Sequence, residues 1–130
     1  MIKEITKEEI FKYVQIAFDG DAELEKYHIA DDDYAGHTYN EICKTAEMMP
    51  LKYYKVGECG FTVFAPGLLY SFGINIKFRD KETLKKWFDE IRNIMPKFEC
   101  ALHGRNSRAI KHLIKQGMEV KEQIIVLQCR

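Results

Sequence analysis

The sequence predicts an α/β fold: a mixed, twisted sheet of about six strands with helices on both faces. Two observations lead to this fold class. Strand and helix patterns alternate along the chain, and a helix separates two strands in its second half, as in a parallel crossover. The chain has 130 residues, of which 46% are hydrophobic, enough for one core. We therefore expect residues 1–130 to form a single domain.

The N-terminal part predicts a strand, a helix and a second helical region. Ile2 to Ile5 form the strand, after which Thr6 and Glu9 make a capping box. The apolar stripe of the capped helix is Ile10, Phe11, Val14 and Phe18. The second region runs from about Ala22 to Met49 and is interrupted near Ala30 to Gly36, so its order stays undefined.

The middle of the chain predicts a three-stranded meander. Its strands are Leu51 to Val56, Phe61 to Ala65 and Leu68 to Phe78. Strict alternation in the third strand places Ser71, Gly73 and Asn75 on one face with Leu69, a surface small and polar enough for a groove. Gly73 is equally compatible with a bulge in that strand.

The last third predicts a helix, a strand, a helix and a strand. Asp80 caps the first helix, Pro96 stops it, and a strand follows from Phe98 to Leu102. Asn106 caps the second helix, Gly117 ends it, and Glu119 to Cys129 form the final strand. The expected core residues of the two helices are Leu84, Trp87, Phe88, Ile91, Ile94, Ala109, Ile110, Leu113 and Ile114.

Asn106, Ala109, Gly117 and Met118 resemble the signature N-x-x-A-x-x-x-x-x-x-x-G-F of the GNAT acetyltransferase superfamily, with Met118 in place of Phe. The predicted order of elements is also that of the GNAT fold. More narrowly, the chain is similar to divergent GNAT-like proteins of bacteriophages and prophages. The resemblance implies transfer of an acetyl group from acetyl-CoA to an amine of a small molecule or a protein.

The resemblance also indicates where cofactor contacts should lie. GNAT enzymes hold the pyrophosphate with a glycine-rich loop after the fourth strand, but the segment from Lys77 to Glu82 has no glycine. Charged and polar side chains at two helix starts are the expected contacts with acetyl-CoA instead. They are Arg79, Lys81, Arg105, Asn106 and Arg108. The alternative is that these charges form a solvated helix surface.

The acid and base of such an enzyme are less well marked. Many GNAT enzymes use a Tyr on the last helix as the acid, and Leu113 occupies that place here. The remaining catalytic candidates are Ser71, Asn75, Glu99 and His103. Two functions therefore stay open: a divergent acyltransferase, or a non-catalytic GNAT-fold binding or structural protein of phage or prophage origin.

Composition limits the other classes. The formal charge is zero, which argues against nucleic acid as a partner, and no apolar run is long enough to span a membrane. The four cysteines show no paired spacing and, with the histidines, no metal-ligand spacing. We expect a cytoplasmic protein without a metal, and the sequence leaves a homo-oligomer open.

Overall fold

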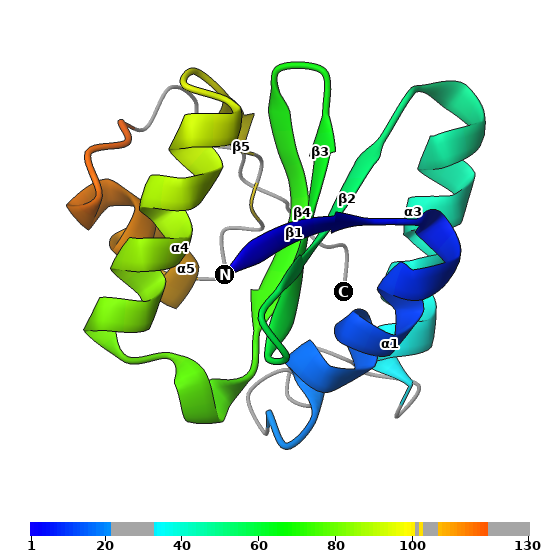
Figure 1. Ribbon diagram of the computed structural model, residues 1–130, viewed down its shortest axis with the longest axis horizontal. Coiled ribbons are helices and arrows are strands. Elements are labelled where there is room, and N and C mark those ends of the chain that lie inside the picture. The colour runs from blue at the N-terminus through cyan, green and yellow to red at the C-terminus, as the bar shows by residue number, and fades with distance from the viewer. Residues whose placement is uncertain (22–32, 101, 103–106, 120–130) are drawn as a thin grey trace, which may run out of the picture. The chain divides into compact units, whose positions relative to one another are not determined.

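The fold is seen in a computed structural model (Figure 1), which describes residues 1–21, 33–100, 102 and 107–119. The chain divides into two compact units, Met1–Glu99 and Cys100–Arg130. Among the described residues, the first holds most of the sheet and three α-helices, and the second holds one further α-helix. The α/β fold class is confirmed. The prediction that residues 1–130 form one domain stays a prediction.

In the described chain the sheet has five strands, in the order β1-β2-β3-β4-β5. The strands are β1 (Ile2–Ile5), β2 (Lys52–Val56), β3 (Gly60–Ala65), β4 (Leu68–Ile74) and β5 (Glu99–Cys100). The first four pair antiparallel with their neighbours. The Glu99 N–H donates to the Gly67 carbonyl at 2.9 Å, so β5 begins beside the start of β4, as a parallel crossover requires. The expected strand from Glu119 to Cys129 lies, apart from Glu119, outside the described residues.

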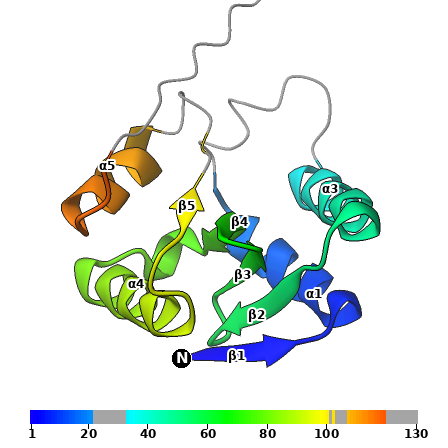
Figure 2. The same cartoon turned by 90° about the horizontal axis from the view of Figure 1, so that it is seen from above.

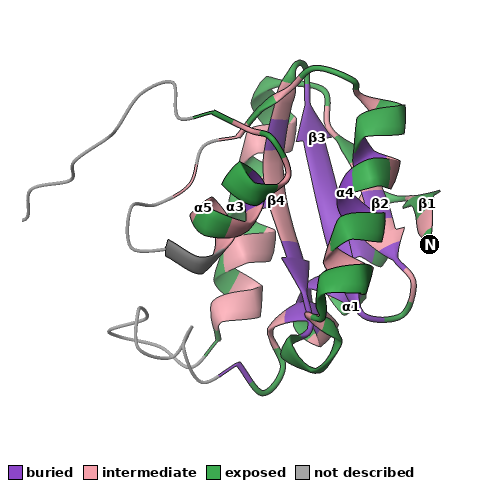
Figure 3. Ribbon diagram, turned by 90° about the vertical axis from the view of Figure 1, so that its left-hand side faces the viewer, coloured by how far each residue is buried: buried purple, intermediate pink, exposed green. Residues whose placement is uncertain are grey.

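Helices α1 (Lys7–Phe18) and α3 (Tyr34–Met48) cover one face of the sheet (Figure 2). The capping box of Thr6 and Glu9 that begins α1 is confirmed. β3 is buried along its whole length (Figure 3), as expected of a central strand covered on both faces. The core on this side consists of Ile10, Tyr13, Val14, Ala17, Ile42, Phe61 and Val63.

Helix α4 (Lys81–Ile94) covers the opposite face and carries the aromatic part of the core. Trp87 is 1% exposed, its Nε1 donates to Thr62 Oγ1 at 2.9 Å, and its ring lies 5.1 Å from that of Phe72. The Asp80 cap of this helix is confirmed, because Asp80 accepts from the Thr83 N–H. The expectation that Ile94 is in the core is wrong. It lies in the last turn and is 41% exposed, so the buried stripe ends at Ile91.

Strand β4 is shorter and less regular than strict alternation predicts. Val63 pairs with Ser71 but Phe64 pairs with Leu69, so Tyr70 is an extra residue that bulges from the ladder. The bulge is therefore at Tyr70 and not at Gly73. Gly73 instead allows close packing, because a Cβ there would lie 2.9 Å from the Phe18 ring. The strand ends at Ile74, and Ile76–Phe78 form a 3₁₀ turn where the strand was expected to continue.

The C-terminal unit contains α5 (Ser107–Lys115). Its predicted end is confirmed: Gly117 has φ +100°, and the N–H groups of Met118 and Gly117 donate to the carbonyls of Leu113 and Ile114. This is a Schellman motif, which places a left-handed residue after the helix. Ile114 is 46% exposed, so its expected place in the core is wrong. Asn106, the predicted cap, lies outside the described residues.

The packing of Trp87 leads to a stability prediction. Trp87→Ala should lower the free energy of unfolding by about 3–5 kcal/mol, because it empties a large, fully buried volume. Trp87→Phe should cost about 1–3 kcal/mol, mainly because the Thr62 hydroxyl loses its buried partner. Chemical denaturation measures both. A loss below about 1 kcal/mol for the alanine variant would contradict the assigned packing.

Candidate functional site

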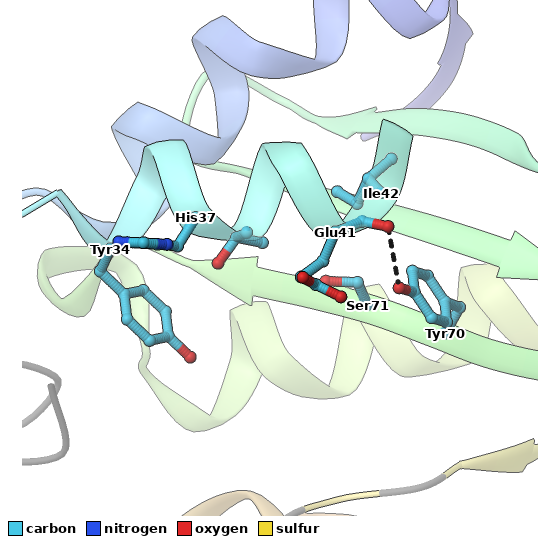
Figure 4. A pocket seen from close by; sticks show the side chains of 7 residues that line it. Tyr34, His37, Glu41, Ile42, Tyr70 and Ser71 are labelled. Atoms are coloured by element: carbon cyan, nitrogen blue, oxygen red, sulfur yellow. Dashed lines mark hydrogen bonds between the residues drawn. The ribbon is translucent and has the colours of Figure 1, made fainter. Parts of the chain in front are cut away.

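A hollow of about 300 Å³ lies between α3 and β4 (Figure 4), and we call it the α3–β4 hollow. It is lined by Tyr34, His37, Thr38, Glu41, Ile42, Tyr70 and Ser71. All of these residues belong to the N-terminal unit.

Local structure explains why these side chains meet. The Asp33 carboxylate accepts from the Gly36 N–H at 2.8 Å and caps α3, which sets the phase of the helix. The lining residues of α3 recur at intervals of three and four, so they form one face of the helix. The Tyr70 bulge brings the two lining residues of β4 into the hollow, because it directs the adjacent side chains of Tyr70 and Ser71 to the same face of the strand.

Tyr70 is held in place by α3. Its hydroxyl lies 2.7 Å from Thr45 Oγ1. It also donates to the Glu41 carbonyl at 3.4 Å, as the dashed line in Figure 4 shows. These contacts orient the phenol ring along the wall of the hollow before any ligand arrives.

Tyr34 forms the opposite aromatic wall. Its ring packs edge-on against Phe18, with the ring centroids 4.8 Å apart. Burial, and secondly the negative charge of Asp21, raise the pKa of the Tyr34 phenol above its usual value. Tyr34 therefore stays protonated at neutral pH and presents a neutral phenol.

Among the described residues that line the hollow, Glu41 is the one with a carboxylate. Its Oε1 lies 3.6 Å from Lys44 Nζ, and the two side chains are 67% and 73% exposed. Such an exposed pair is weak and easily exchanged for another cation. The described part of the lining contains no Lys or Arg, and it offers hydroxyls, aromatic rings, the His37 imidazole and the Glu41 carboxylate.

The segment after β4, where the resemblance implies a phosphate-binding loop, has a different organisation. Asn75 Oδ1 accepts from the Lys77 N–H at 3.0 Å, and the Asn75 carbonyl accepts from the Phe78 N–H at 2.8 Å. The Arg79 N–H donates to the Ile76 carbonyl at 3.5 Å. The backbone donors of residues 77–79 are thus used within the turn.

The side chains of this segment are also engaged. Arg79 Nε donates to the Ile74 carbonyl at 2.7 Å, and its Nη2 contacts the Asp21 carboxylate at 2.6 Å. Asp21 is 4% exposed, so the pair is largely shielded from solvent on that side. The Thr83 hydroxyl and backbone N–H hydrogen-bond to Asp80 and hold the pKa of its carboxyl below the usual range. The Arg79 guanidinium and the first turn of α4 are thus each contacted by a carboxylate of the chain itself.

The other predicted site residues are spread over the structure. Ser71 lies in the α3–β4 hollow, whereas Asn75 is a buried residue whose Nδ2 donates to the carbonyls of Ile16 and Asp19. Lys81 and Glu99 are exposed at the starts of α4 and β5. His103, Arg105 and Asn106 lie outside the described residues, and Arg108 is in the first turn of α5. Their assignments to acetyl-CoA or to catalysis stay predictions.

Tyr34, His37 and Glu41 were missed by sequence reasoning. The signal was present in their helical spacing, but the acidic run before them left the helical order of this region undefined. Among the described residues, no group of three or more His, Cys, Asp and Glu side chains is placed to hold a metal ion. None of the described helices is both long and apolar enough to cross a membrane.

Comparison with known proteins gives a similarity of fold and no family. No protein-family model matches the sequence, and a search of curated proteins gives no match. Among solved structures, the chain is similar to a transcriptional regulator from Bacillus halodurans C-125, with a TM-score of 0.56 and 13% sequence identity. The match covers 99% of each chain, so the similarity is not limited to one part of either chain.

The contacts of Asn75 give a second stability prediction. Asn75→Asp should lower the free energy of unfolding by about 2–4 kcal/mol, because it replaces two donated hydrogen bonds with a carboxylate facing two carbonyls. Ser71→Ala is the control on the same strand and should change stability by about 0.5 kcal/mol or less. Thermal or chemical denaturation compares the two. Equal stability of both variants would show that Asn75 does not join β4 to α1.

Proposed function

We propose that the chain is a GNAT-like domain that recognises a ligand or a partner without transferring an acetyl group. The observation that carries the proposal is the internal use of the backbone donors of residues 77–79 after β4. A pyrophosphate is held by free N–H groups at such a turn, and close approach depends on glycine. This turn offers neither, and Arg79 is already paired with Asp21.

The whole-length neighbour described as a transcriptional regulator has a similar fold, so the fold is compatible with a role in recognition. The α3–β4 hollow supplies a place for recognition that does not depend on the turn after β4. The narrower resemblance to phage and prophage proteins stays a prediction.

A second candidate is the divergent acyltransferase, which would move an acetyl group from acetyl-CoA to an amine. The observation in its favour is the bulge of β4, which turns the hydroxyl-bearing residues Tyr70 and Ser71 into the same hollow. In that case Lys81, Arg105 and Arg108 would carry the charge attraction for the cofactor.

Calorimetry with acetyl-CoA separates the two candidates. We expect no saturable binding at physiological salt, and at low salt only weak binding that an Arg105→Ala/Arg108→Ala double variant loses, because exposed charges are screened. Thermal denaturation is the independent readout: acetyl-CoA at 100 times a true Kd would add about 2.7 kcal/mol of stability.

Incubation with acetyl-CoA and a mixture of polyamines and lysine peptides, followed by mass spectrometry, tests transfer itself. We expect no acetylated product. Tight, salt-insensitive binding together with an acetylated amine would overturn the non-catalytic proposal and establish the enzyme.

A further inference from the structure

We infer that the α3–β4 hollow binds a small organic cation with an apolar body. The inference rests on the proposed function, since it gives a recognition domain its class of ligand. The site is recognised by three properties of its described lining: aromatic rings on two sides, the negative charge of Glu41, and a fixed shape.

Aromatic rings supply the first property. Tyr34 from α3 and Tyr70 from β4 line the hollow from two different elements, and the buried Ile42 is an apolar residue of the lining. The faces of aromatic rings attract cations, and the attraction is strongest where water is displaced. A ligand with methyl or methylene groups around its charge would gain from both the rings and the apolar surface.

Charge supplies the second property. In Figure 4 the Glu41 side chain reaches from α3 toward Ser71 on β4. Among the lining residues that the structure describes, none is Lys or Arg and His37 is the one imidazole, so the Glu41 charge favours a cation over a carboxylate or phosphate. The 3.6 Å contact with Lys44 is exposed and long, so a bound cation can replace it.

Shape supplies the third property. The volume of about 300 Å³ lies at the lower end of the range for ligand pockets, which favours a small molecule. The Tyr70 ring is held by its hydroxyl contacts with Thr45 and the Glu41 carbonyl, and the Tyr34 ring by packing on Phe18. Binding therefore requires little ordering of these side chains.

The probe is benzyltrimethylammonium, which carries no N–H and cannot accept an acetyl group. Titration followed by amide chemical shifts should give saturable changes at residues 34–42 and 70–71, with a Kd on the order of 1 mM or below. Benzyl alcohol and benzoate at the same ionic strength are the neutral and anionic controls. Both should bind at least about 3-fold more weakly.

Matched variants test the two attractive groups. Glu41→Gln should raise the Kd about 3- to 5-fold, whereas Glu47→Gln, an exposed change on the same helix outside the lining, should leave it unchanged. Tyr34→Phe keeps the ring and should bind like the parent, whereas Tyr34→Leu should bind about 3-fold or more weakly. Denaturation of each variant verifies that the fold is intact.

Shifts confined to other residues, equal affinity for benzoate, or identical Kd values for Glu41→Gln and Glu47→Gln would each overturn the cation site. These outcomes are independent of acetyl-CoA. Acetyl transfer by the protein would refute the non-catalytic proposal even if the ammonium probe binds. Failure of the probe to bind would overturn the cation site and leave the non-catalytic proposal unaffected.

Discussion

The side-chain amide of Asn75 holds the end of β4 against the end of α1, and the surrounding structure depends on this junction. Its Nδ2 donates to the carbonyls of Ile16 and Asp19 at 2.7 and 3.2 Å, so one group satisfies two acceptors at the end of a helix. Its Oδ1 accepts from the Lys77 N–H and starts the following turn. The close approach of α1 to β4 at Gly73 follows from the same junction.

This junction also determines what the end of β4 can bind. The backbone N–H groups of residues 77–79 are satisfied by Asn75 and Ile76, and Arg79 Nε and Nη2 contact the Ile74 carbonyl and the Asp21 carboxylate. The stabilisation of the turn and the binding of an anion there compete for the same groups. This is why the proposed recognition site lies elsewhere, in the α3–β4 hollow.

The two faces of the sheet are packed differently. On the α4 face, Trp87 and Phe72 fill the space, and the Thr62 hydroxyl satisfies the indole N–H. On the other face, α1 packs closely at Gly73, but α3 meets β4 beside the Tyr70 bulge and leaves the hollow. Strand β3 is buried along its whole length between the helices of the two faces, and this close packing supports the shape of the hollow.

The sequence by itself determined the local elements: the Thr6–Glu9 capping box, the Asp80 cap and the Gly117 end of α5. Each depends on groups within about one helical turn, so a short stretch of sequence contains all the information. Most of the candidate site could not be predicted from the sequence. Asn75 binds a carbonyl 59 residues away, Tyr70 bonds to a residue 25 away, and the bulge depends on pairing with β3. The contacts of Asn75 and Tyr70 and the position of the bulge were decided only by the tertiary structure. Many distant groups could bond to the same side chain, and the packing of the folded chain selects the actual partner.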